Sequence, residues 1–272
     1  MKKVFLSVLF LLAVAAAAGW IYLRRFEYHQ LYAPSSDIAA TPAQFRLRYQ
    51  DVQFSAADGT PITGWWIPAN RPRGTVVYCS GNAGNIGDRA YLAPEFFKRG
   101  FNLLLWDYRG YGASGGRPSE RGIYQDALAA FDAAKAMSGN LPVVVYGHSL
   151  GAAVAVQIAC ERPAAALVVQ SGFASAADIA RRWYPRIPLH RVLSVSYDSA
   201  AKAATLDGLP KLFGHSLSDE VIPFQSGRIL HAAAADPKTF VLLAGGHNDN
   251  SWFEPGAPGH AELEAFLAPF GR

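Results

Sequence analysis

The sequence predicts an α/β fold: a mostly parallel central sheet with helices on both faces, preceded by a hydrophobic N-terminal helix. Short apolar runs of strand length alternate with helix-like stretches, which is typical of strand–helix–strand units and of a parallel sheet. The N-terminus holds a long apolar stretch without charge. We therefore expect a transmembrane anchor or signal segment at residues 1–25, a linker at 26–45 and one α/β domain at 46–272.

Length and composition are sufficient for one such domain with an N-terminal extension. Hydrophobic residues make up 51% of the chain and charged residues 17%, which excludes a disordered chain. The net charge of +4 resides in Lys2, Lys3, Arg24 and Arg25, so the rest is neutral and we expect no nucleic-acid partner. With two cysteines and no metal-ligand spacing, we expect two buried thiols, no metal and no cofactor.

The N-terminal segment favours a membrane. Residues 4–23 carry no charge, and as a helix they would span the ~30 Å hydrocarbon core of a bilayer. Their Leu, Ile, Val and Phe side chains favour insertion by about 3–7 kcal/mol. A retained single-span anchor is favoured over a cleaved signal peptide, because Trp20 and Tyr22 continue the apolar stretch past the alanines at 15–18. The balanced flanking charges leave the orientation nearly undecided, with a slight preference for the extracytoplasmic side.

The remaining chain should begin with an antiparallel hairpin at 46–54 and 62–68, turning at 57–59. Buried strands are expected at 75–78, 102–106, 143–146, 166–169, 211–213 and 239–243. Helices are expected at 89–98, 122–136, 152–160, 224–234 and 260–267. In parallel sheets, sites form beyond the carboxyl ends of the strands, so the residues just after each strand are the ones to inspect.

Ser149 is the candidate nucleophile. The segment 147–151 reads Gly-His-Ser-Leu-Gly and matches the nucleophile-elbow pattern G-x-S-x-G. The pattern alone is weak, but here it follows a strong strand and precedes a strong helix, as the elbow requires. The flanking glycines would remove Cβ atoms that collide as strand and helix close around the turn.

Two other segments resemble this pattern without its context. Ser114 lies in a second match at 112–116, where glycines and a proline follow, so we interpret it as a loop serine. The segment 214–218 lacks the final glycine and has no helix directly behind it.

A serine nucleophile needs a general base and an orienting carboxylate, and after an elbow these follow in the order Asp or Glu, then His. His247 follows the terminal strand at a Gly-Gly turn and is the candidate base. Asp219 follows the preceding strand and is the candidate acid. Glu220 is adjacent and competes, whereas Asp249 is too close to His247 in sequence.

Backbone N–H groups should stabilise a developing oxyanion. One donor is expected to be the N–H of Leu150, directly after the nucleophile. The second is expected from the glycine-rich loop 79–85, and we nominate the N–H of Asn82. A phosphate-cradling loop is the rival interpretation, but no Gly-Lys-Ser/Thr follows.

From about Phe45 to its end, the chain resembles membrane-anchored serine hydrolases of the bud-emergence type, within the α/β-hydrolase superfamily. That group includes acyl-protein thioesterases and lysophospholipid lipases. Matching stretches lie at 80–85, 107–112, 118–120, 147–151, 219–223 and 246–248. The resemblance implies an α/β-hydrolase fold, with Ser149, Asp219 and His247 at the triad positions. Similar proteins usually have His where this chain has Ser80, so the loop is held differently.

The segment between 171 and 210 has no room for a large cap domain, and its Trp183, Tyr184, Pro185 and Pro188 suggest a small apolar lid suited to an acyl chain. We expect a metal-independent hydrolase that cleaves carboxylic esters, with a small-molecule or lipid-like ester as substrate. An acyl-thioesterase or a serine peptidase or amidase is the alternative, because the triad alone does not separate them. A non-catalytic membrane scaffold is disfavoured because it would need no triad.

Overall fold

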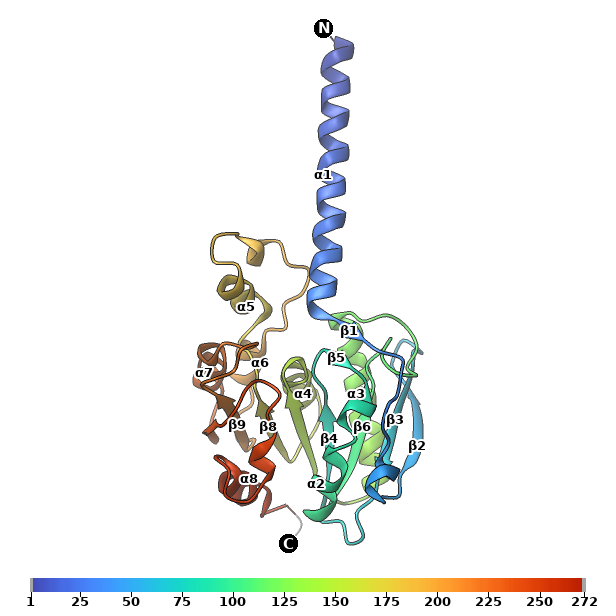
Figure 1. Cartoon of the computed structure of the whole chain (residues 1–272), viewed down its shortest axis with the longest axis vertical. Helices are drawn as coiled ribbons and strands as arrows, with labels where there is room; N and C mark the ends of the chain where they lie inside the picture. The colour runs from blue at the N-terminus through green and yellow to red at the C-terminus, as the bar shows by residue number, and fades with distance from the viewer. Residues whose placement is uncertain (1, 271–272) are drawn as a thin grey trace. The chain divides into compact units, whose positions relative to one another are not determined.

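The computed structural model describes residues 2–270, and their contacts divide the chain into two units that meet between Ala33 and Pro34. The N-terminal unit is the single helix α1 (Lys2–Leu31) (Figure 1). It runs through residues 26–31, where we expected a linker, because the first helix-stopping proline comes only at Pro34. Among the described residues, α1 has the length and composition to cross a membrane. Its apolar side chains are exposed, including Phe10 at 69%.

The C-terminal unit is built on an eight-stranded sheet, and the expected strands and hairpin are present. The strands are β2 (Gln50–Ser55), β3 (Pro61–Ile67), β4 (Gly74–Cys79), β6 (Phe101–Trp106), β7 (Val143–His148), β8 (Ala166–Gln170), β9 (Lys211–Ser216) and β10 (Lys238–Leu243). β2 and β3 pair antiparallel, β3 pairs antiparallel with β6, and the other pairs are parallel. The two-residue strands β1 (Ala33–Pro34) and β5 (Ala83–Gly84) lie outside this sheet. The fold class predicted from the sequence is confirmed.

The strand order is β10-β9-β8-β7-β4-β6-β3-β2. β4 therefore lies between β6 and β7, although it precedes both in the chain. The chain leaves β4 toward one edge of the sheet, then returns from β6 to the other side of β4. Such a reversal opens a crevice at the carboxyl ends of the strands on either side of it. The loops after β4 and β7 are therefore the ones that border this crevice.

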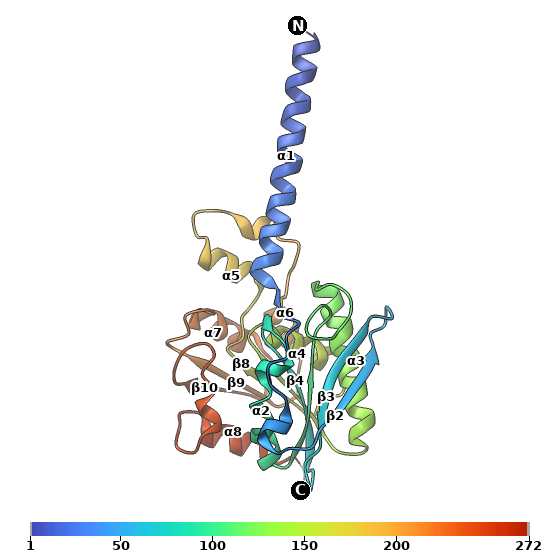
Figure 2. The same cartoon turned by 45° about the vertical axis from the view of Figure 1, so that its right-hand side comes forward.

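Helices cover both faces of the sheet, as Figures 1 and 2 show. They are α2 (Leu92–Lys98), α3 (Glu120–Ser138), α4 (Leu150–Glu161), α5 (Ala176–Trp183), α6 (Ser199–Ala203), α7 (Phe224–Ala233) and α8 (His260–Leu267), with 3-10 turns at Pro42–Phe45, Ile86–Arg89, Leu189–Arg191 and Ser251–Phe253. Alternate strand residues such as Tyr78 and Tyr146 share one core with Phe96 of α2 and Leu263 of α8. The intervening strand residues are just as buried, so the sheet is apolar on both faces.

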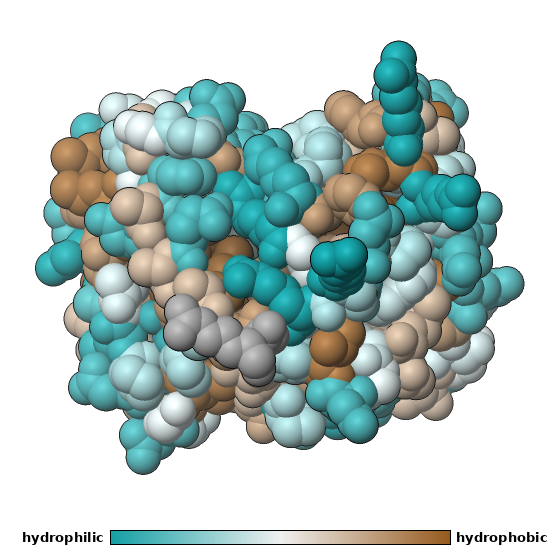
Figure 3. All heavy atoms as spheres, turned by 90° about the horizontal axis from the view of Figure 1, so that it is seen from below, coloured by the Kyte–Doolittle hydropathy of each residue, from teal (hydrophilic) through white to brown (hydrophobic). Residues whose placement is uncertain are grey.

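The segment between β8 and β9 forms the small lid. It holds α5, the turn Leu189–Arg191 and α6, of which the sequence analysis predicted neither helix. Three large apolar side chains of this segment stay exposed: Trp183 at 42%, Ile187 at 54% and Val192 at 37%. Elsewhere on the domain, the face in Figure 3 intersperses hydrophilic and hydrophobic residues.

The two cysteines differ in exposure. Cys79 is buried at the end of β4, but Cys160 is exposed, so the prediction of two buried thiols is wrong for Cys160. Cys160 lies in the last turn of α4, and its sulfur faces Thr205 Oγ1 at 3.9 Å rather than the sheet. Both thiols are free.

Candidate active site

Ser149 occupies a sharp turn between β7 and α4. Its backbone has φ 56° and ψ −121°, a left-handed conformation that a residue with a side chain adopts only under strain. The neighbouring glycines explain how the turn closes. A Cβ at Gly147 would overlap the carbonyl of Gly151, and a Cβ at Gly151 would overlap the carbonyl of Cys79. The collision inferred from the sequence is therefore the reason that both positions are glycine.

The structure brings the three predicted triad residues into one hydrogen-bonded chain. Ser149 Oγ lies 2.9 Å from His247 Nε2. His247 Nδ1 lies 3.0 Å and 2.9 Å from the two carboxylate oxygens of Asp219. The three residues follow β7, β9 and β10, so they meet at the carboxyl edge of the sheet although nearly a hundred residues separate Ser149 from His247. Ser149 and His247 are only 6% and 4% exposed.

Asp219 and Glu220, the two competing carboxylates, both bind His247, but at different atoms. Asp219 faces the imidazole ring, whereas Glu220 Oε2 accepts the backbone N–H of His247 at 2.9 Å. Asp219 is therefore the one that can fix the tautomer and orientation of the ring. Glu220 fixes the loop that carries the ring.

Asp219 is held as a carboxylate by several donors. The backbone N–H groups of Val221 and Ile222 donate to its Oδ1 at 3.0 and 2.7 Å. His215 Nε2 lies 3.2 Å from its Oδ2 and 3.0 Å from the Ile222 carbonyl oxygen. Burial raises the pKa of Asp219, but hydrogen bonds from His215 and His247 outweigh burial and hold that pKa well below its usual range.

Sequence reasoning missed His215. It lies in the segment 214–218, which drew notice only as an incomplete copy of the serine motif. The available signal was its place at the end of the strand that leads to the candidate acid. Gly227 makes room for the ring, because a Cβ there would overlap His215 Nδ1.

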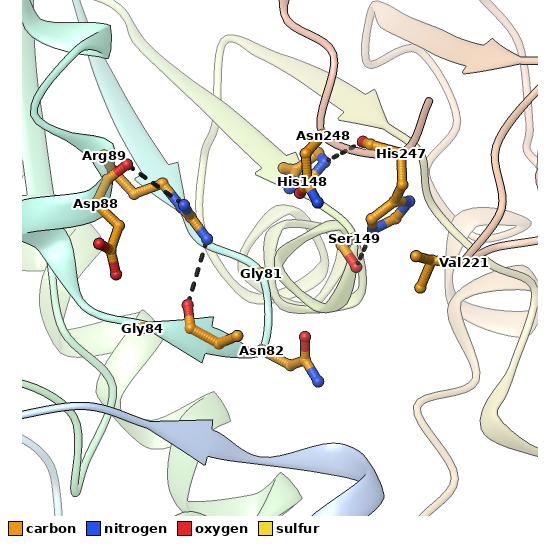
Figure 4. Close-up of a pocket in the computed structure, with 11 residues that line it drawn as sticks. Gly81, Asn82, Gly84, Asp88, Arg89, His148, Ser149, Val221, His247 and Asn248 are labelled. Atoms are coloured by element: carbon orange, nitrogen blue, oxygen red, sulfur yellow. Dashed lines mark hydrogen bonds between the residues drawn. The ribbon is translucent and has the colours of Figure 1, made fainter. Parts of the chain in front are cut away.

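A cavity of about 290 Å³ opens beside Ser149 (Figure 4). One wall is the loop after β4, including Asn82, and another carries His247 and Asn248. Leu150 is the first residue of α4, next to Ser149. Within residues 2–270, no group of His, Cys, Asp and Glu side chains is arranged to hold a metal ion.

Two tyrosines hold the backbone of the loop after β4, which forms one wall of the cavity. The Tyr108 hydroxyl donates to the carbonyl oxygen of Ser80 at 2.6 Å, and the Tyr111 hydroxyl donates to that of Asn82 at 2.7 Å. The Ser80 hydroxyl itself is buried, with no hydrogen-bond partner among the described residues. At Ser80 and Asn82 this loop is therefore held through its backbone.

His148 is buried beside the triad, and its Nε2 lies 3.0 Å from the carbonyl oxygen of His247. Burial, and after it the neighbouring His247, lowers the pKa of His148 to about 3. The ring is therefore neutral near pH 7. Because a carbonyl oxygen can only accept, the neutral ring must carry its proton on Nε2 and donate it.

Ser114, the serine of the second match to the elbow pattern, makes hydrogen bonds that hold a loop. Its hydroxyl donates to the carbonyl oxygen of Asp107 at 2.9 Å and accepts the backbone N–H of Thr63 at 2.9 Å. Arg109 lies in the same loop and pairs with Asp126 at 2.8 Å and with Asp58 at 2.8 Å. These contacts brace loops and place no group beside Ser149.

Comparisons with known proteins agree with this architecture. The family model for serine aminopeptidase, S33, matches residues 70–200. An uncharacterised protein of Mycobacterium tuberculosis is 37% identical over 249 residues, which cover 90% of this chain and 88% of that protein. The α/β-hydrolase domain-containing protein WAV2 of Arabidopsis thaliana is 31% identical over 271 residues, covering 88% and 86%. Lysophosphatidylserine lipase ABHD12 of Macaca fascicularis is 36% identical over 185 residues, covering 61% and 46%.

Among solved structures, a Pyrococcus furiosus esterase superposes with a TM-score of 0.71 at 18% identity, covering 89% of this chain and 99% of the esterase. At that identity the likeness concerns the fold. The relative from Arabidopsis carries the family assignment, because its similarity extends over most of both chains. The chain belongs to the α/β-hydrolase superfamily.

Proposed function

We propose that this hydrolase cleaves carboxylic esters through an acyl-enzyme formed on Ser149. The observation that carries the proposal is the unbroken hydrogen-bonded chain from Ser149 Oγ through His247 to Asp219. A serine hydroxyl needs such a base to be nucleophilic near neutral pH, and the base needs an orienting carboxylate. The strained turn presents the hydroxyl at the cavity.

In both half-reactions, His247 takes up one proton and then gives it back. Ser149 Oγ attacks the ester carbonyl carbon while His247 Nε2 takes its proton, and ionised Asp219 stabilises the imidazolium. Collapse of the tetrahedral intermediate breaks the bond to the leaving alcohol, which receives the proton from His247. Water then attacks the acyl-enzyme by the same route, releasing the acid and restoring the Ser149 hydroxyl.

The oxyanion donors in this proposal are the backbone N–H groups of Leu150 and Asn82. Leu150 begins α4, and the first N–H groups of a helix have no partner within it and lie at its positive end. Asn82 lies in the cavity wall, and its carbonyl is tied to Tyr111. Each such donor typically contributes about 10²–10³ in rate.

A serine peptidase or amidase is the second candidate, favoured by the family model that matches residues 70–200 and is described as a serine aminopeptidase. An acyl-thioesterase would use the same groups. Turnover of an ester, a thioester and an amide with one common acyl group separates the three. An amide turned over faster than its ester would replace the ester proposal with the peptidase one. A non-catalytic membrane scaffold would turn over none.

A lipid-like ester is the substrate class we favour, because an apolar helix precedes the domain and because one relative is named a lysophosphatidylserine lipase. We propose that α1 is a retained single-span anchor. A cleaved signal peptide is the alternative, because an N-terminal apolar helix serves either purpose.

The first test is labelling with a fluorophosphonate, which reacts with activated serines. Wild type should label, Ser149→Ala should not, and Ser114→Ala should label like wild type, because Ser114 makes only structural contacts. Circular dichroism of each variant serves as the folding control. Equal labelling of Ser149→Ala and wild type would show that the nucleophile is a different residue.

A further inference from the structure

Arg89 lines the same cavity as Ser149 and His247. It is the last residue of the turn Ile86–Arg89, and Figure 4 shows its guanidinium pointing into the cavity on the side across from Ser149. The carboxylate of its neighbour Asp88 points away from Ser149 in the same view. That carboxylate accepts the backbone N–H of Asn85 at 3.1 Å. Both residues line the cavity, but the carboxylate of Asp88 is engaged with the backbone of Asn85.

The guanidinium has no carboxylate partner among residues 2–270, where its hydrogen bonds go to two backbone carbonyl oxygens. These are the oxygens of Asp88 at 3.4 Å and Ala83 at 3.3 Å, both longer than an ordinary N–H···O bond. Its Nε is buried and has no hydrogen-bond partner in the described part of the chain.

Three arginines that brace this fold have a different environment, whereas Arg73, like Arg89, donates to a backbone carbonyl oxygen. Arg109, Arg162 and Arg182 each pair with a carboxylate, at 2.8, 2.7 and 2.9 Å respectively. In these three cases a fixed acceptor of opposite charge satisfies the guanidinium. Arg89 has no such acceptor among residues 2–270, so its positive charge is available to interact with a ligand in the cavity.

The other titratable groups around the cavity do not neutralise this charge. The side chain of Asp219 is buried and is bound to His247. His148 is neutral near pH 7, because burial lowers its pKa to about 3, with the positive charge of Arg89 acting in the same direction. Asp88 also lines the cavity, but it is exposed, so solvent screens its carboxylate. The cavity beside Ser149 therefore favours an anion.

We propose that Arg89 binds an anionic group of the substrate, a phosphate or a carboxylate, and so selects esters that carry such a group near the scissile carbonyl. This inference rests on the proposed function and adds the substrate class. The planar guanidinium matches the oxygen pairs of both groups. A cavity of about 290 Å³ is at the small end for ligand sites, which suits a headgroup rather than a long chain.

The experiment compares matched neutral and anionic esters with the full chain in non-ionic micelles. The first pair is 1-oleoylglycerol and its 3-phosphate, which places a phosphate on the alcohol side. The second pair is ethyl butyrate and monoethyl succinate, which places a carboxylate on the acyl side. The enzymes are wild type, Arg89→Gln, Arg89→Lys and Arg121→Gln. Arg121 is an exposed arginine of α3 outside the cavity and serves as the matched control.

We expect wild type to prefer the anionic member of at least one pair, and that pair identifies the anion. Arg89→Gln should lower the anionic-to-neutral ratio of kcat/KM by about 10- to 100-fold, mainly through KM, because a charge-assisted hydrogen bond is lost. Arg89→Lys should keep part of the preference, because lysine retains the positive charge but not the planar pair of N–H donors. Arg121→Gln should keep the wild-type ratio.

Two results would overturn the inference: a wild-type enzyme with no preference in either pair, or an Arg89→Gln variant that slows both members of a pair equally. The second result would mean that Arg89 only holds the carbonyls of Ala83 and Asp88. Labelling of Ser149 by a neutral fluorophosphonate tests the proposed function separately. If Ser149 is labelled but the anionic-to-neutral ratios of kcat/KM do not change in the Arg89 variants, only this inference fails. If neither labelling nor turnover occurs, both proposals fail.

Discussion

Three titratable groups with buried side chains in the domain differ in charge because their surroundings differ. Asp219 is ionised, since four donors surround it. His148 is neutral, since burial lowers its pKa to about 3. One oxygen of Asp107 accepts the Ile86 N–H, the other is buried with no partner among residues 2–270, and burial raises its pKa to about 7. Such contrasts are what allow one site to hold an acid and a base together.

His148 and Asp107 should impose opposite pH dependences on stability. Between pH 4.5 and 6.5, roughly the interval between the two unfolded pKa values, the unfolded state protonates His148 more than the folded state does. The contribution of His148 to the free energy of unfolding therefore falls as the pH falls. Asp107 is protonated more in the folded state, so its contribution falls as the pH rises. Each slope is at most about 1.4 kcal/mol per pH unit, with opposite sign.

Single variants should expose the two slopes. The melting temperature of Asp107→Asn should rise more steeply with pH than that of wild type, and that of His148→Gln should rise less steeply or fall. Thermal melts of the full chain at pH 4.5, 5.5 and 6.5 measure this. Parallel curves for all three proteins would contradict the assigned protonation states.

At the scale of elements, the segment between β8 and β9 exposes apolar side chains. Trp183 and Ile187 project apolar surface from the segment between β8 and β9, outside the core cluster. An isolated exposed apolar residue needs no explanation, but several in one short segment suggest a contact with something apolar. We interpret this segment as the surface that an acyl chain covers.

Replacing Trp183 and Ile187 together with serine should lower kcat/KM for a long acyl ester by about tenfold or more, because burying one such side chain stabilises a complex by about 1.5–3 kcal/mol. Acetyl ester turnover should change little. Ile229→Ser on α7, also an exposed isoleucine, is the control. Equal wild-type turnover of acetyl and long acyl esters would contradict the acyl-chain role of the lid.

For the whole molecule, the N-terminal unit is the candidate membrane segment. α1 presents apolar side chains along its length, with Leu11 at 64% and Leu12 at 61% exposure. Replacing both with lysine should move the chain from the carbonate-washed membrane fraction to the soluble one. Two charges at the centre of a helix cost about 5–7 kcal/mol, as much as the apolar residues contribute. Leu11→Ala with Leu12→Ala controls for lost side-chain volume.

The intact mass of the purified chain separates the two membrane interpretations. A mass that includes residues 4–23 supports the anchor. A mass that begins after the alanines at 15–18 would establish a cleaved signal peptide instead.

The sequence by itself determined the strand and helix alternation, the serine turn and the places of Asp219 and His247 after their strands. It could do so because these features are local: periodicity marks buried strands, and a glycine on each side of Ser149 marks a closed turn. The hairpin, too, was predictable, since its turn residues lie between its strands.

Tertiary structure decided what depends on distant partners. The strand order brings the loop after β4 beside Ser149, and no local pattern specifies that order. Asp219 rather than Glu220 faces the ring of His247 because of how two loops meet. His215 and Arg89 are ordinary residues in the sequence, and they gain significance only from a carboxylate and a cavity that other segments supply. Long-range packing creates these environments, so only the folded chain reveals them.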